Sequence, residues 1–197
     1  SQSTYYLNHE SSHVALNSAS VTCLLPVRNG EQFIENTIRT ISDSTLNRDE
    51  ILVVNDGSED FTKQILTGLA NDVPNLRVID TSGIGLVDAL NLGIKEAQNS
   101  LIARFDVDDI YDRSRIQLQR ETFESSNAPV AVFSDYEFTD SKESYLGTIY
   151  TAVFPAETSL SLITSSRTPH PGVMYLREAV IAAGGYRQED FPAEDLS

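Results

Sequence analysis

From residue 21 onward, short apolar runs alternate with segments whose apolar residues recur every three or four positions. The apolar runs span 21–27, 50–56, 76–80 and 101–105, which are ordinary strand lengths. The segments between them, at 31–42, 59–73 and 85–97, have the spacing of amphipathic helices. This alternation predicts an α/β fold, in which a mostly parallel central sheet carries helices on both faces.

Each of these helices is predicted to have one apolar face. The residues expected on these faces are Phe33, Ile34, Ile38 and Ile41 in the first helix, Phe61, Ile65 and Leu69 in the second, and Leu86, Leu90, Ile94 and Ala97 in the third. The second half of the chain is less regular. There we predict helices at 112–126, 156–166 and 177–185, and strands at 130–138 and 172–176.

Length and charge narrow the possibilities further. The chain has 197 residues, within the range of one domain. We expect residues 1–19, which are polar and rich in serine, to form a lead-in to a single domain at 20–197. The net charge of −15 argues against a nucleic-acid partner, because binding to phosphate backbones needs a basic surface.

Cysteine usage and hydropathy indicate where the protein works. Cys23 is the only cysteine and lies in an apolar run, so we expect a buried thiol and no internal disulfide. No apolar stretch is long enough to span a bilayer, and no signal peptide opens the chain. These features favour a reducing compartment, and we predict a cytoplasmic location.

Three aspartates, Asp106, Asp108 and Asp109, follow the fourth apolar run directly. Ligands bind beyond the carboxyl ends of the strands in an open parallel sheet, so this cluster is predicted to lie at the ligand-binding edge. Asp106 and Asp108 would point to the same side if the extended backbone continued past the strand. Such a pair suits magnesium or manganese, shared with substrate phosphates. The alternative is a solvated acidic turn before a helix whose predicted N-cap is Asp112.

Two other acidic motifs can be compared with this spacing. A calcium-binding EF-hand loop starting at Asp106 would need an oxygen ligand, a glycine and a glutamate where the chain has Ile110, Tyr111 and Gln117, so it is excluded. A phosphatase of the haloacid dehalogenase type also carries Asp-x-Asp after an apolar strand. There the motif normally follows the first strand, whereas three predicted strands come earlier here. This phosphatase is kept as a weaker alternative.

Four segments, taken in order, resemble those of family 2 glycosyltransferases. They are VTCLLPVRNGEQFIENTIRTI at 21–41, EILVVNDGSEDFT at 50–62, GLVDALNLGIKEAQNSLIARFDVDD at 85–109 and HPGVMYLREAVIAAGGYRQEDFPAEDLS at 170–197. In the second segment Asn55 replaces the usual first aspartate of the family's Val-Asp-Asp-Gly-Ser motif, whereas Asp56 matches the second. The resemblance therefore runs from about residue 21 to the last residue.

This resemblance implies a GT-A fold, whose Rossmann-like half binds the nucleotide. It implies a nucleotide-diphosphate sugar donor, a divalent cation (magnesium or manganese), inversion at the anomeric carbon and a saccharide or lipid-linked acceptor. Cell-surface polysaccharide or glycoconjugate synthesis at the inner face of the membrane is the expected setting. Family members usually continue beyond the equivalent of residue 197, so we expect a domain truncated at its C-terminal end. A nucleotide-sugar-binding fragment without turnover is the alternative.

The resemblance also assigns roles to individual residues. Those expected to line the donor site are Pro26, Val27, Glu35, Asp56, Ser58, Asn91, Gly93, Arg104, Asp106 and His170. Asp108, together with Asp106, is expected to hold the metal ion, and Asp195 is expected to be the general base. An inverting transfer needs such a base on the face of the sugar opposite the departing diphosphate.

Structural roles remain open for several of these residues. Asp56 has the spacing of a helix cap with Glu59, and Asn91 would equally suit a plain helix surface. His170 alone is more often structural. Glu194 and Asp195 read, on composition alone, as an exposed acidic pair near a chain end, and Glu194 is the next candidate for the base.

Overall fold

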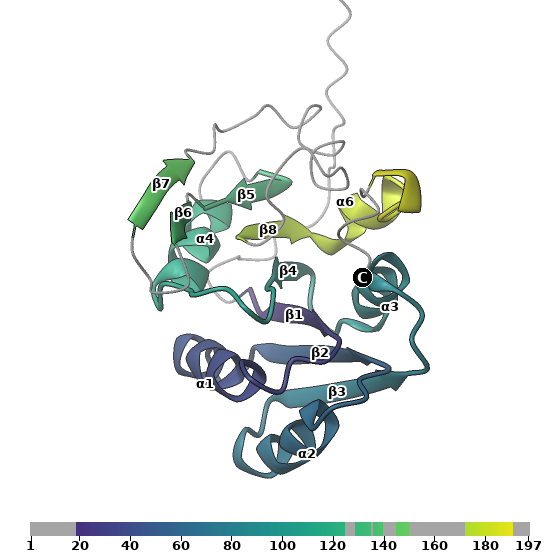
Figure 1. The fold of residues 1–197 in the computed structure, drawn as a ribbon. Coiled ribbons are helices and arrows are strands. Elements are labelled where there is room, and N and C mark those ends of the chain that lie inside the picture. The colour runs from purple at the N-terminus through teal and green to yellow at the C-terminus, as the bar shows by residue number, and fades with distance from the viewer. Residues whose placement is uncertain (1–18, 125–128, 135, 140–144, 150–171, 191–197) are drawn as a thin grey trace, which may run out of the picture.

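In the computed structural model, the described residues are 19–124, 129–134, 136–139, 145–149 and 172–190 (Figure 1). Strands and helices alternate through the first half, as the hydrophobic pattern predicted. The elements of that half are β1 (Val21–Val27), α1 (Ile34–Ser44), β2 (Glu50–Asp56), α2 (Thr62–Asp72), β3 (Leu76–Thr81), α3 (Leu86–Glu96), β4 (Leu101–Arg104) and α4 (Arg115–Glu124). The later elements are β5 (Ala131–Phe133), β6 (Tyr136–Thr139), β7 (Tyr145–Ile149), β8 (Val173–Leu176), α6 (Arg177–Ala182) and the 3₁₀ turn Gln188–Asp190.

A mixed sheet of six strands organises the described residues, in the order β3-β2-β1-β4-β8-β5. β1 pairs in parallel with both β2 and β4, and β2 pairs in parallel with β3. β8 is antiparallel to both of its neighbours. The first four strands therefore end at one edge, which we call the carboxyl edge, and begin at the opposite amino edge. The prediction of a mostly parallel sheet is confirmed.

Helices cover both faces of this sheet (Figure 1). Alternate residues of β1 divide between two buried clusters, because successive side chains of a strand point to opposite faces. Cys23 and Leu25 pack with residues of α1, α2 and α4. Leu24 packs on the other face with residues of α3 and α6. Cys23 is fully buried, and burial raises the pKa of its thiol far above the ordinary value, as expected for an inert core thiol.

The predicted helix starts were wrong at two aromatic residues. Phe33 and Phe61 were expected on buried helix faces, but they are 48% and 66% exposed. Each occupies the N-cap position, one residue before its helix. Their side chains are not set by the helical period, because the preceding polar loops fix where each helix begins. Leu66 takes the buried place in α2 that Phe61 was expected to fill.

The single strand predicted at 130–138 is two strands in two sheets. β5 ends at Phe133, opposite Val173 at the start of β8. The backbone N–H of Ser134 then donates to the Gly172 carbonyl at 3.0 Å, and no β8 residue remains to pair beyond it. β6 instead pairs with β7 in a separate ribbon, which was not predicted. Two consecutive polar residues, Ser134 and Asp135, mark this break in the sequence, and the prediction of one strand passed over them.

Some expectations fall outside the described residues. These are the lead-in at 1–18, the helix predicted at 156–166, and the region after residue 190. Among the helices that the structure does describe, none has the length and hydropathy needed to cross a bilayer.

Candidate functional site

Two loops at the carboxyl edge are joined by reciprocal hydrogen bonds. Asn29, which follows β1, adopts a positive φ of 54°. Its backbone N–H donates to Ser58 Oγ at 2.9 Å, and its Oδ1 accepts the N–H of Glu59 at 2.8 Å. Ser58, predicted beside the nucleotide, therefore helps to hold the β1–α1 loop against the β2–α2 loop.

Further hydrogen bonds join the same two loops at the start of α2. Asp60 accepts the backbone N–H of Glu31 at 3.0 Å and that of Thr62, the first residue of α2, also at 3.0 Å. In return, Glu31 Oε2 accepts the N–H of Phe61 at 2.9 Å. These acids were not identified from the sequence, although RNGE and GSEDFT contain the capping residue types. These reciprocal hydrogen bonds hold the β1–α1 and β2–α2 loops together at the carboxyl edge.

Asp56, the last residue of β2, holds a third loop rather than capping α2. It is 4% exposed. Its Oδ1 accepts hydrogen bonds from the Thr81 hydroxyl and from the Ile84 N–H at 2.7 Å, and its Oδ2 accepts the Gly85 N–H at 2.8 Å. Burial alone would raise the pKa of Asp56, but these hydrogen bonds outweigh it and lower the pKa. The alternative that Asp56 caps α2 is therefore wrong, because its carboxylate accepts hydrogen bonds from the loop before α3 instead.

Asn55 stands where the family pattern has an aspartate. Its Nδ2 donates to Asp80 Oδ1 at 2.7 Å, and its own Oδ1 is buried without a hydrogen-bond partner among the described residues. Lys63 pairs with Asp80 at 3.0 Å. An amide at this position can donate to Asp80, whereas an aspartate would place two carboxylates together. The substitution therefore removes a like-charge contact beside Asp56.

The acidic cluster begins where β4 ends, and one buried cation partly compensates it. Arg104 is 3% exposed, and its Nη2 lies 3.2 Å and 3.4 Å from the two carboxylate oxygens of Asp106. Its Nε and Nη1 have no hydrogen-bond partner in the described part of the chain. The Arg104 guanidinium also lies 5.9 Å from the ring centroid of Tyr186. The sequence left open whether Arg104 meets an acid or a phosphate, and the structure pairs it with an acid.

The extended backbone assumed for Asp106 and Asp108 does not continue. The chain turns at Val107 and Asp108, where Asp106 is half-buried and Asp108 is exposed. No described lysine or arginine forms an ion pair with Asp108. Asp109 is exposed as a residue, but the protein around its carboxylate limits hydration and raises its pKa to about 6, and the negative charges of Asp106 and Asp108 contribute to this rise. The cluster therefore carries more negative charge than its protein neighbours neutralise.

This arrangement fits a shared metal ion better than a fully enclosed one. No group of three or more histidine, cysteine, aspartate or glutamate side chains forms a ready cage within the described residues. Magnesium and manganese, however, are commonly held by one or two carboxylates, with substrate phosphates and water filling the other positions. The exposed oxygens of Asp108, beside the half-buried Asp106, fit that donor set. Asp112, in contrast, accepts the Ser114 N–H at 2.7 Å before α4, as predicted for a cap.

Contacts with helix α1 and with the loop after β1 fix the position of this acidic loop. Thr37, on α1, donates its hydroxyl to the Val107 carbonyl at 2.7 Å. A Cβ atom at Gly30 would lie 2.6 Å from Val27 and 3.1 Å from Val107, so only glycine lets these segments approach so closely. Val27 and Pro26, predicted to line the nucleotide pocket, are buried at the end of β1. The structure brings the end of β1 close to the acidic loop.

Three predicted donor-site residues have other partners. Glu35 is on the exposed side of the first turn of α1, where its carboxylate pairs with Arg39 at 2.9 Å. Asn91 is not a plain helix-surface residue, since its amide accepts the Tyr186 N–H and donates to the Tyr186 carbonyl, both at 2.9 Å. Gly93 packs against β1, because a Cβ atom there would lie 2.2 Å from Leu24. Any contribution of Asn91 or Gly93 to a ligand site would be indirect.

Two predicted residues cannot be placed. Asp195, the predicted base, and His170 lie outside the described residues. Whether either approaches the acidic loop stays a prediction.

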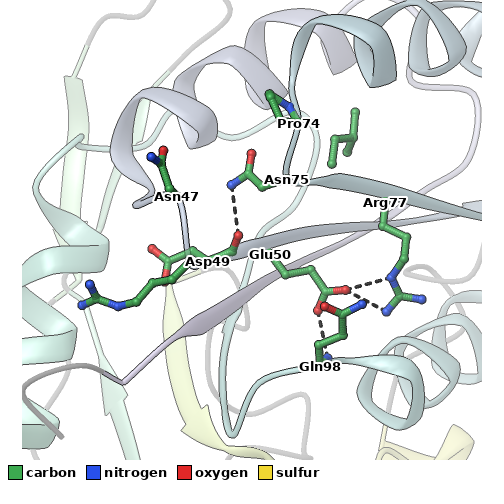
Figure 2. A pocket seen from close by; sticks show the side chains of 9 residues that line it. Asn47, Asp49, Glu50, Pro74, Asn75, Arg77 and Gln98 are labelled. Atoms are coloured by element: carbon green, nitrogen blue, oxygen red, sulfur yellow. Dashed lines mark hydrogen bonds and ion pairs between the residues drawn. The ribbon is translucent and has the colours of Figure 1, made fainter.

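The structure also has a surface depression away from the carboxyl edge. It measures about 660 Å³ and lies at the amino edge, lined by polar residues that include Glu50, Asn75, Arg77 and Gln98 (Figure 2). Glu50 accepts Arg77 Nε at 2.8 Å through one oxygen, and the Gln98 N–H at 2.9 Å through the other. Its acids Asp49 and Glu50 are already paired with Arg120 and Arg77, so they offer a ligand little, and the acidic loop remains the better candidate.

Comparison with known proteins agrees with this geometry. The sequence model of "Glycosyl transferase family 2" matches residues 22–183. An *Escherichia coli* protein named as a UDP-Gal:alpha-D-GlcNAc-diphosphoundecaprenol beta-1,3-galactosyltransferase is 24% identical, with 86% of this chain and 62% of that protein covered. The chain spans only about a quarter of the length of two curated relatives from Rickettsia bellii and Rickettsia conorii.

Solved structures show the same fold. *Staphylococcus aureus* TarS, residues 1–349 in complex with UDP-GlcNAc, aligns with a TM-score of 0.68 and 18% identity, covering 89% of this chain and 51% of that one. The mannosyltransferase PcManGT of *Pyrobaculum calidifontis*, in complex with GDP-Man and Mn²⁺, aligns with a TM-score of 0.64 and 19% identity, covering 90% and 50%. The expected glycosyltransferase fold is thereby confirmed.

Proposed function

The chain belongs to glycosyl transferase family 2, and we propose that it transfers a sugar from a nucleotide-diphosphate donor to an acceptor hydroxyl at the carboxyl edge of its sheet. The observation that carries the proposal is the acidic loop. Asp106 is paired with Arg104, whereas Asp108 is exposed and has no described cationic partner. A loop that is this acidic, in a protein of net charge −15, cannot attract a diphosphate by itself.

A divalent cation reconciles an acidic site with an anionic donor. Asp108, with Asp106 beside it, would hold magnesium or manganese together with the donor diphosphate. When bound, such an ion supplies the positive charge that stabilises the departing diphosphate. PcManGT, of similar fold, was solved with a nucleotide sugar and Mn²⁺, which supports this choice of ion.

The nucleotide would lie on the loops that follow β1, β2 and β3. Asp56 fixes the loop at Ile84 and Gly85 through its carboxylate, and Ser58 fixes the turn at Asn29. The base or ribose of the donor would then meet a surface whose backbone is already ordered. Pro26 and Val27 form its apolar floor, and Glu35, on the outer side of α1, is the least supported of the predicted contacts.

The proposed reaction is a single displacement with inversion. The acceptor hydroxyl oxygen attacks the anomeric carbon as the bond from that carbon to the diphosphate oxygen breaks. Asp195 takes the hydroxyl proton, and the electron pair of the broken bond leaves with the diphosphate. His170 would lie beside the donor sugar. Both residues are assigned by resemblance alone.

The acceptor is proposed to be a saccharide or lipid-linked saccharide in cell-surface polysaccharide or glycoconjugate synthesis, at the inner face of the membrane. The name of the *Escherichia coli* relative, which acts on a GlcNAc-diphosphoundecaprenol, supports that class. The phosphatase alternative has lost its support, because the acidic loop follows β4 in a chain that matches a glycosyltransferase family.

Asp195→Asn tests the catalytic part of this proposal. Asparagine keeps the size of the side chain but cannot accept a proton at neutral pH, so transfer from the preferred nucleotide sugar should fall by about 10²–10⁴-fold. Donor affinity should be unchanged. Glu194→Gln is the matched control, and a loss of transfer in that variant alone would move the base to Glu194. A parent protein that binds the donor but neither transfers the sugar nor hydrolyses the donor would instead be a binding module.

A further inference from the structure

One hydroxyl group holds the backbone of the acidic loop. Tyr111 Oη accepts the backbone N–H of Asp106 at 2.6 Å. The same oxygen lies 3.0 Å from the Asp106 carbonyl and 3.2 Å from Asp109 Oδ2, both of which can accept its proton. Tyr111 thus contacts two of the three clustered aspartates, although no motif marked it in the sequence.

The ring of Tyr111 is fixed by packing that does not involve its hydroxyl. It meets Phe105 edge-on, with ring centroids 4.6 Å apart. The buried guanidinium of Arg115 lies 4.2 Å from the Phe105 centroid and 5.2 Å from that of Tyr111. Arg115 Nη2 also donates to the carbonyls of Arg104, at 2.8 Å, and Val173, at 3.2 Å. The hydroxyl is therefore held at a set position relative to β4 and β8.

The hydroxyl can donate its one proton either to the Asp106 carbonyl or to the Asp109 carboxylate. As an acceptor, by contrast, its oxygen has one described donor, the backbone N–H of Asp106. Burial raises the pKa of Tyr111, and the charges of Asp109 and Asp106 add to the rise, so the group stays protonated at neutral pH. The contact with Asp106 N–H is also the shortest of the three. The backbone of Asp106 is therefore the partner that the hydroxyl positions most directly.

We propose that Tyr111 is the positioning residue of the donor site, and that it acts through the backbone of Asp106. This inference rests on the proposed function. The hydroxyl sets where the chain leaves β4 and begins the turn at Val107 and Asp108, and hence where the Asp106 and Asp108 carboxylates meet the cation and diphosphate. Tyr111 itself would touch neither ligand.

Tyr111→Phe separates the hydroxyl from the ring. The variant keeps the contacts with Phe105 and Arg115, so its melting temperature should stay close to that of the parent. Its dissociation constant for UDP with Mn²⁺, or for GDP with Mn²⁺ if the parent prefers guanosine, should rise about two- to tenfold, the range expected for one lost hydrogen bond. Asp112→Ala, which removes a helix cap in the same segment, should lower the melting temperature and leave nucleotide affinity unchanged.

A double-mutant cycle identifies the partner of the hydroxyl. If Tyr111 acts through Asp106, the loss of affinity on changing Tyr111 to Phe should be the same in an Asp109→Asn background. A loss that disappears in that background would assign the role to Asp109 and overturn the proposal. Equal affinity of parent and Tyr111→Phe would also overturn it. A parent that binds neither nucleotide would instead contradict the proposed function.

Discussion

The paired acids at the amino edge and the acidic loop at the carboxyl edge use their carboxylates for opposite purposes. At the amino edge, Asp49 and Glu50 are buried, and each of their carboxylate oxygens accepts at least one hydrogen bond. At the carboxyl edge, Arg104 partly compensates Asp106, and the neighbouring aspartates are exposed. Acidic residues that are fully paired hold the fold together, whereas acidic residues left open at the ends of strands remain available to a ligand.

Asp49 shows the structural use most clearly. It pairs with Arg120 at 2.6 Å, with the two side chains 0% and 2% exposed. It also accepts the backbone N–H of Val21 at 2.9 Å and of Leu46 at 2.8 Å. One carboxylate thus joins the start of β1, the loop before β2 and helix α4. Asp49 also lines the depression in Figure 2, together with Glu50, Arg77 and Gln98, which are joined by hydrogen bonds.

The largest effect should come from Asp49→Ala. The change leaves Arg120 buried without its partner, so the free energy of unfolding in urea should fall by about 3–5 kcal/mol. Nucleotide affinity of the folded molecules should not change. In the double variant Asp49→Leu, Arg120→Met, part of the stability should return, because no unpaired charge remains. The N–H groups of Val21 and Leu46 would still lack their acceptor, so the recovery should be incomplete. A loss below about 1 kcal/mol, typical of an exposed pair, would contradict the structural role.

A smaller effect is expected for Asp56→Ser. Asp56 is a paired structural carboxylate and also lies at the edge proposed to bind the donor. The carboxylate stabilises the loop before α3, so its loss should reduce the free energy of unfolding by about 1–3 kcal/mol. Donor affinity should fall as well, because that loop is proposed to receive the nucleotide. Asp80→Asn, an exposed change at the same edge, is the control and should alter neither quantity much. Unchanged donor affinity in a destabilised Asp56→Ser protein would make Asp56 purely structural.

The smallest effect concerns pH. The folded-state pKa of Asp109 is raised to about 6, above its ordinary value of 3.8. The folded state therefore binds the proton more tightly than the unfolded state, and the stability linked to this group is lost as the pH rises from 4 to 7. Asp109→Asn should raise the melting temperature of the metal-free protein at pH 7 and have little effect at pH 4. A difference that is independent of pH would contradict the raised pKa.

Much of this organisation was readable from the sequence. Continuous apolar runs, such as β1, and helical spacing, as in α3, report burial directly, and burial decides the layers of the fold. Asp106 could be placed at the ligand edge because the carboxyl ends of parallel strands share one edge. Four segments in the family order then indicated the chemistry.

The remainder depended on contacts between residues distant in the sequence. The pairing of Asn91 with the Tyr186 backbone joins positions 95 residues apart, and no local pattern signals it. The loops before α1 and α2 are likewise held together by hydrogen bonds across 30 residues, as between Asn29 and Glu59. The partners of Tyr111 are close in the sequence, but its contact with the Asp106 backbone depends on the turn of the acidic loop, which periodicity does not predict. Local periodicity predicts which face of an element is buried, but not which polar groups meet at its ends.

The most direct test of a cation-dependent donor site at the carboxyl edge is calorimetry of nucleotide binding to the parent protein and to Asp108→Asn. The nucleotide is first chosen by thermal shift from UDP-galactose, UDP-GlcNAc and GDP-mannose, because a ligand at a hundredfold excess over its dissociation constant adds about 2.7 kcal/mol of stability. The parent should bind its preferred nucleotide with Mn²⁺ and lose most of that affinity in chelator. Asp108→Asn should keep the melting temperature of the metal-free protein and lose the Mn²⁺-dependent binding. Equal affinity of the variant and the parent in Mn²⁺ would contradict the site.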